Sequence, residues 1–114
     1  MALAPFSHAV ERINGCKVYT DKSGNFLVVE GETPLKVFPA STRTPKKEIV
    51  NWVYDRNREL AMQRDRYQCV NCSSRSNLQC HHKVHRGMAG GWRDDRISNL
   101  ETLCNECHAR EHGG

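Results

Sequence analysis

A chain of 114 residues has room for one domain with a short extension, and it can build only a small hydrophobic core. Hydrophobic residues make up 38% of the sequence and the mean hydropathy is −0.71, so a bound metal is an expected supplement to apolar burial. The formal net charge of +4 permits a polyanionic partner but does not identify one.

The sequence indicates no membrane segment, because no apolar run approaches the roughly 18–20 residues of a membrane span. Residues 1–15 lack a basic start followed by an apolar run, which argues against a signal peptide. We therefore expect a cytoplasmic protein, in which paired cysteines are metal ligands more often than disulfides.

The patterning predicts an α+β protein in three parts. These are an N-terminal β extension (1–43), a basic linking helix (44–66) and a C-terminal core (67–114). In the extension, β-prone runs separated by turn residues predict a small antiparallel meander with strands at 16–20, 26–30 and 35–38. A packing role is favoured over a DNA-reading role for this extension, because it holds no catalytic constellation.

The linking helix is predicted from its start signal and its apolar spacing. Thr44 is an N-cap residue and Pro45 suits the first helical position. An incomplete apolar face follows, formed by Ile49, Trp52, Val53, Leu60 and Met62. The basic side chains of this helix either pair with acidic neighbours or contact phosphate, and Arg64 and Arg66 are the better candidates for phosphate contact.

The core begins with a metal-binding pattern. Cys69 and Cys72 form one Cys-x-x-Cys pair, and Cys104 and Cys107 form a second. Four thiolates in two such pairs bind zinc tetrahedrally. Between the pairs lie 31 residues (73–103), which exceeds the roughly 15–20 of a simple zinc ribbon.

The long segment between the pairs must therefore contain structure of its own. Residues 78–84 and 99–103 are strand candidates on either side of a Gly-rich loop, and a helix is expected near the second pair. The result is a β–loop–β–helix unit that one zinc holds at both ends.

Histidines occur throughout the same unit. His81 and His82 are adjacent in a strand, so their side chains point to opposite faces and can divide two tasks. His108 and His112 are four residues apart and share one helix face. If that helix packs across the hairpin, the two helical histidines converge with His81 on one ion. Open positions on that ion would accept water and a phosphate oxygen.

Four motifs follow one another in the core: Cys69-x-x-Cys72, His81-His82, Asn99-Leu100 and Cys104-x-x-Cys107-His108. Together they resemble the HNH endonucleases, whose nuclease core is the ββα-metal fold. The resemblance covers roughly residues 60–112. The spacing of Asn99, His108 and His112 is similar to that of the colicin-type members.

The resemblance implies a role for each motif residue. His81 and His108 would be ligands of the catalytic metal, and His112 would be a third ligand that only some subfamilies have. His82 would be the general base that takes a proton from the attacking water. Asn99 would brace the loop that holds this base, and the four cysteines would form a structural zinc site.

These residues predict a metal-dependent DNA endonuclease. A neutral imidazole near pH 7 can activate water, and one divalent ion can stabilise charge on the phosphate. The expected products carry 5′-phosphate and 3′-hydroxyl ends. A monomer would nick one strand per event, whereas double-strand cleavage would need a homodimer or two events. Mg²⁺ or Mn²⁺ is favoured as the catalytic metal over Ni²⁺ or Zn²⁺. The alternative is a non-catalytic zinc module that interacts with nucleic acid.

Several other side chains are assigned weaker roles. Cys80 is expected to be a buried small hydrophobic residue, and His85 an exposed loop residue. Cys16 and His8 are expected to be structural or incidental. One or two of the arginines around the expected cleft should hold the scissile phosphate, and these are Arg86, Arg93, Arg96 and Arg110.

Overall fold

The structure, a computed structural model, describes residues 6, 8–84 and 94–113, and the side chains as far as residue 110. In chain order its elements are β1 (His8–Ile13), β2 (Cys16–Thr20), β3 (Phe26–Glu30), β4 (Thr33–Phe38), α1 (Pro45–Arg64), β5 (Leu78–His82), the 3₁₀ helix η1 (Ile97–Asn99), β6 (Leu100–Cys104) and α2 (Asn105–Gly113). They form two compact units, residues 1–53 and 54–114, and α1 runs from the first into the second. The predicted α+β class is confirmed. No helix in the described part of the chain is long and apolar enough to cross a membrane.

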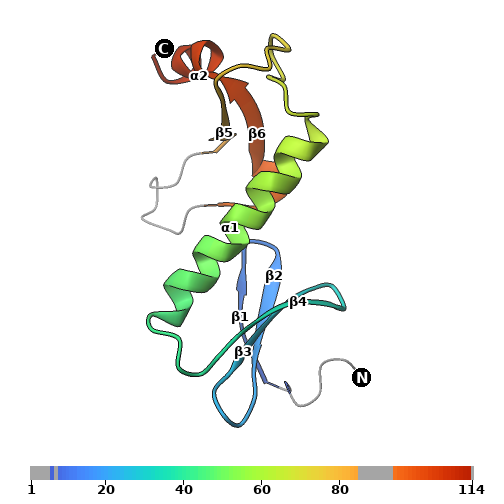
Figure 1. Ribbon diagram of the computed structural model, residues 1–114, viewed down its shortest axis with the longest axis vertical. Helices are drawn as coiled ribbons and strands as arrows, with labels where there is room; N and C mark the ends of the chain where they lie inside the picture. The colour runs from blue at the N-terminus through green and yellow to red at the C-terminus, as the bar shows by residue number, and fades with distance from the viewer. Residues whose placement is uncertain (1–5, 7, 85–93, 114) are drawn as a thin grey trace. The chain divides into compact units, whose positions relative to one another are not determined.

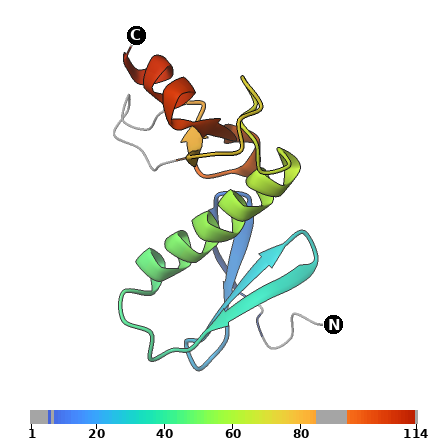
Figure 2. The same ribbon diagram turned by 45° about the horizontal axis from the view of Figure 1, so that its top comes forward.

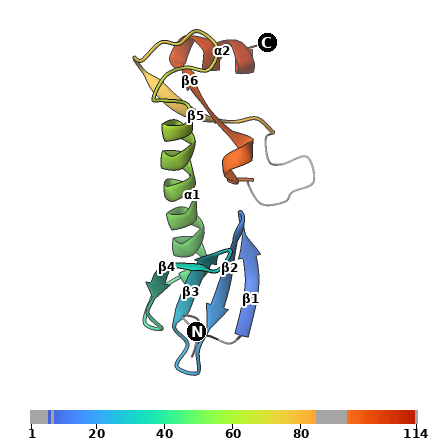
Figure 3. The same ribbon diagram turned by 90° about the vertical axis from the view of Figure 1, so that its right-hand side faces the viewer.

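The first unit contains a four-stranded antiparallel sheet in the order β1-β2-β3-β4 (Figure 3). The sequence predicted only three strands, and β1 was missed. Five of its six residues are exposed and only Ile13 is buried, so this strand lacks the apolar alternation that marks a half-buried strand. A two-residue turn at Asn14 and Gly15, with φ of 47° and 92°, joins β1 to β2.

The first half of α1 supplies the other side of this unit's core. Its side chains Ile49 and Val53 are buried with residues of all four strands, among them Val18 and Val28. Cys16 is fully buried in the same cluster, so its structural role is evident. The helix begins at Pro45, as the sequence predicted.

The second unit contains a β–β–helix arrangement (Figure 1). β5 and β6 pair antiparallel, with Leu78 opposite Cys104 at one end and His82 opposite Leu100 at the other. The helix α2 follows β6 directly and contacts both strands of the hairpin, as Figure 2 also shows. The predicted order of strand, strand and helix is confirmed, and the Gly-rich segment between the strands lies outside the described residues.

The end of α1 is tied to β6 by hydrogen bonds. The Asp65 carboxylate accepts a hydrogen bond from the Thr102 backbone N–H at 3.0 Å. Arg64 binds the same carboxylate and donates to the carbonyls of Leu100 (2.6 Å) and Ile97 (3.1 Å). Burial raises the pKa of Asp65, but hydrogen bonds from Arg64 and Thr102 outweigh it and hold that pKa below its usual value. Arg64 therefore braces the hairpin.

Replacing Asp65 with alanine should lower the free energy of unfolding by about 1–3 kcal/mol, because the Thr102 N–H and the Arg64 guanidinium lose their acceptor. The exposed Asp55 on α1 offers a matched control, and Asp55→Ala should change that free energy by less than about 0.5 kcal/mol. Urea unfolding of both zinc-loaded variants measures the difference. Equal stabilities for the two variants would show that the bond does not brace β6.

Candidate metal and catalytic site

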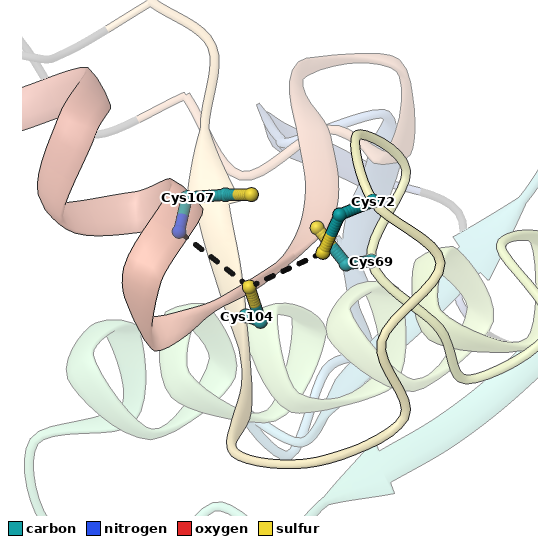
Figure 4. Close-up of side chains that lie close together, drawn as sticks. All are labelled: Cys69, Cys72, Cys104 and Cys107. Carbon is teal, nitrogen blue, oxygen red and sulfur yellow. Dashed lines mark hydrogen bonds between the residues drawn. The ribbon is translucent and has the colours of Figure 1, made fainter.

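Four cysteine sulfurs gather at one end of the second unit. Their Sγ atoms all lie within 4.8 Å of one another. Cys69 and Cys72 come from the loop after α1, Cys104 ends β6, and Cys107 lies in the first turn of α2. Figure 4 shows the four sulfurs turned toward a shared space. Three separate segments of the chain therefore meet at one point.

The spacing of these sulfurs suits a tetrahedral zinc ion. Zn–S bonds of about 2.3 Å in a tetrahedron place sulfurs about 3.8 Å apart. The Cys72 and Cys104 sulfurs are 3.6 Å apart. An all-thiolate donor set favours zinc over hard cations such as Mg²⁺. The residues present therefore fit a structural zinc.

The protonation of the thiols is uneven. Burial raises the pKa of Cys69, but backbone N–H groups that include those of Cys104 and Cys72 outweigh this and lower it to about 6. Hydrogen bonding with the Cys104 and Cys69 sulfurs raises the pKa of Cys107 to about 12. Zinc must displace the remaining thiol protons, because only thiolates bind it strongly.

Replacing Cys104 with serine should remove the zinc and much of the stability of this unit, because zinc binding and folding are coupled in small metal-braced domains. Cys80→Ser is the matched control, since Cys80 lies in the same hairpin but outside the sulfur cluster. Zinc content by mass spectrometry and thermal unfolding with and without a chelator measure the effect. Full zinc content in Cys104→Ser would contradict a four-cysteine site.

His81 and His108 lie together, and His108 directly follows Cys107 of the sulfur cluster. The His81 side chain is 4% exposed, on β5. Its ring meets the His108 ring of α2 edge to face, with ring centroids 5.3 Å apart. Two imidazoles on one ion, with metal–nitrogen bonds of about 2.0–2.1 Å at a tetrahedral angle, have centroids about 5 Å apart. The distance between the two rings is compatible with two ligands of one metal, and it also lies in the range of an ordinary edge-to-face ring contact.

His82 has different neighbours from His81. Its Nε2 atom lies 2.7 Å from Oδ1 of Asp95, and its ring stacks on Tyr54 of α1 with centroids 5.9 Å apart and an interplanar angle of 11°. The contacts of His81 are with α2, whereas those of His82 are with α1 and the segment before η1. This difference follows from the alternation of side chains along β5.

Asn99 lies in η1, not in a strand as the sequence predicted. Its side-chain amide donates to the carbonyls of Val84 (3.2 Å) and Asp94 (2.8 Å), and its side-chain oxygen accepts from the Val84 N–H (3.0 Å). Its backbone carbonyl accepts from the Lys83 N–H. Asn99 therefore joins residue 84 to residue 94 and fixes the chain on both sides of the intervening loop.

Three residues near His82 were missed by the sequence reasoning: Tyr54, Asn57 and Asp95. Asn57 offered a signal, because Val53, Asn57 and Ala61 share one buried stripe of α1 and only Asn57 is polar. For Asp95 the sequence offered no comparable signal apart from its position shortly before Asn99.

The residues to which the sequence assigned minor roles differ in their surroundings. The Arg96 guanidinium donates two hydrogen bonds to the Asp94 carboxylate, at 2.8 and 2.9 Å. Cys80 is half-buried, and burial raises the pKa of its thiol. Arg66 and Arg110 are exposed. Other expected site residues lie outside the described part of the structure, namely His85, Arg86, Arg93, the Gly-rich segment 87–91 and the side chain of His112.

Comparison with known families matches residues 69–114 to the HNH endonuclease family. This C-terminal part of the chain is therefore similar to an HNH endonuclease domain. The match begins at Cys69 and includes every cysteine and histidine of the two sites. It indicates a nuclease or another function related to nucleic acid. Neither the curated proteins nor the solved structures gave a match to the chain.

Proposed function

We propose that this HNH protein is a metal-dependent DNA endonuclease that hydrolyses phosphodiester bonds to 5′-phosphate and 3′-hydroxyl ends. The observation that carries the proposal is the contact between the His81 and His108 rings, whose distance suits two ligands of one ion, in a unit that also gathers four cysteines. A zinc-braced hairpin with a second, histidine-lined site is more than a binding module requires.

The catalytic metal would be held by His81 and His108, with His112 as a further ligand on the same helix. Imidazole ligands with open positions accept Mg²⁺ or Mn²⁺, which we favour, as well as Ni²⁺ or Zn²⁺. When bound, the ion would supply positive charge at the scissile phosphate and the departing 3′ oxygen. The exposed cations Arg66 and Arg110 are candidates for contact with neighbouring phosphates.

His82 would act as the general base. Neutral imidazole can take a proton from water at pH 7, and His82 is partly exposed, with a relative side-chain accessibility of 18%. His81 and His82 are the last two residues of β5, so their Cα atoms are about 3.8 Å apart. A phosphodiester at the end of this strand would lie within reach of both side chains.

One catalytic centre per chain would cut one strand per event. A monomer would therefore release nicked circles from supercoiled plasmid, and linear product would require two chains or two events. DNA is the proposed partner.

Replacing His82 with alanine should reduce plasmid nicking by about 10²–10⁴-fold, because the general base is lost. His8→Ala is the matched control, since His8 is exposed on β1 of the other unit. The assay incubates supercoiled plasmid with each protein and Mg²⁺, Mn²⁺, Ni²⁺ or Zn²⁺, and it separates nicked from linear DNA on a gel. If wild type leaves plasmid intact with every metal but retards it on the gel, the protein is the non-catalytic zinc module.

Replacing His81 or His108 with alanine should abolish nicking in a protein that stays folded. Each variant should keep one equivalent of zinc, because all four cysteines remain, and should bind Mn²⁺ or Ni²⁺ at least about 10-fold more weakly. Titration calorimetry on zinc-loaded protein measures that affinity. Unchanged affinity in both variants would place the catalytic metal elsewhere.

A further inference from the structure

Asp95 is an acidic side chain that the motif pattern leaves without a role. It is 0% exposed. A buried carboxylate is costly unless it is paired or hydrogen-bonded, so its partner carries information. One partner is His82, whose Nε2 atom lies 2.7 Å from Oδ1 of Asp95.

The backbone of Asp95 is itself fixed by α1. Asn57, which is 1% exposed, donates from Nδ2 to the Asp95 carbonyl at 2.9 Å. The Asn57 side-chain oxygen accepts a hydrogen bond from Nη1 of Arg56 at 3.0 Å. The carboxylate is therefore presented to His82 from a buried position that is held by hydrogen bonds.

The second contact of His82 fixes a different degree of freedom. Stacking on Tyr54 sets the plane of the imidazole ring, whereas the hydrogen bond to Asp95 sets its rotation within that plane. Tyr54 and Asn57 are three residues apart and therefore lie on the same face of α1. One helix face thus supports both contacts.

We propose that Asp95 is a positioning residue for His82, an inference that rests on the proposed role of His82 as general base. A carboxylate only accepts hydrogen bonds, so Nε2 of neutral His82 must carry the proton. Nδ1 is then the nitrogen that accepts the proton of the attacking water. Water loses that proton to Nδ1, the resulting hydroxide forms the new P–O bond, and the 3′ oxygen leaves with the electron pair of the broken bond.

The test combines kinetics and NMR on the full zinc-loaded chain. Asp95→Asn keeps the shape of the side chain but offers an N–H donor, so it should favour the Nδ1–H tautomer of His82. The expected result is a fall in kcat of about 10²–10⁴-fold with little change in KM. The control Asp55→Asn, on the exposed face of α1, should keep wild-type kcat.

Long-range ¹H–¹⁵N correlation spectra at pH 8, where imidazoles of ordinary histidines are neutral, report the tautomer directly. Wild-type His82 should be the Nε2–H form and should change in Asp95→Asn. Asn57→Ala, which keeps the carboxylate but releases its backbone, should mix the two forms. Thermal unfolding and zinc content establish that each variant is folded.

Two results would overturn the inference while leaving the proposed function intact. One is an Nδ1–H tautomer in wild type, and the other is a kcat for folded Asp95→Asn within twofold of wild type. Failure of the proposed function has a different signature, namely wild type that cuts no DNA with any metal. The spectra still decide in that case whether Asp95 sets the orientation of His82.

Discussion

The clustering of four sulfurs is the constraint on which the second unit depends. Its buried apolar cluster consists of Leu103, three of the four cysteines and the partly buried Leu78. Ala61, Met62 and Leu100 are also buried in this unit, but the total apolar burial is modest beside the entropy of ordering a hairpin and a helix. A zinc ion held by the four cysteines would join the loop after α1, the end of β6 and the start of α2. It would add free energy of folding, because metal binding in such a unit is coupled to folding.

The two faces of the hairpin carry side chains with different contacts. The β5 side chain at position 81 meets α2, and the next side chain meets α1. One face therefore presents the imidazole that meets His108, and the other presents an imidazole held by a carboxylate and an aromatic ring. Asn99 fixes the chain where the loop leaves and rejoins the unit. The separation follows from the two-residue period of a strand.

The sequence predicted what depends on short-range chemistry. Cysteine spacing and the proline at the start of α1 each constrain a few neighbouring residues, and the structure agrees at both. β1 was missed although Asn14-Gly15 is a strong hairpin signal, because the strand before it is exposed and lacks alternation. The partnership of His82 with Asp95 joins residues 13 apart across a loop, and no spacing rule distinguishes Asp95 from Asp94.

Asn57 shows that a long-range contact of this kind can still be indicated by the sequence. Its neighbours in the buried stripe of α1, Val53 and Ala61, are apolar, and a polar side chain there costs stability unless its hydrogen bonds are made. The bond from Asn57 to the Asp95 carbonyl meets that requirement. A polar residue in an apolar stripe breaks the local rule for core packing, and sites that break such rules are often functional. In this chain the polar exception is Asn57, which holds the backbone of Asp95, and the Asp95 carboxylate faces the proposed base His82.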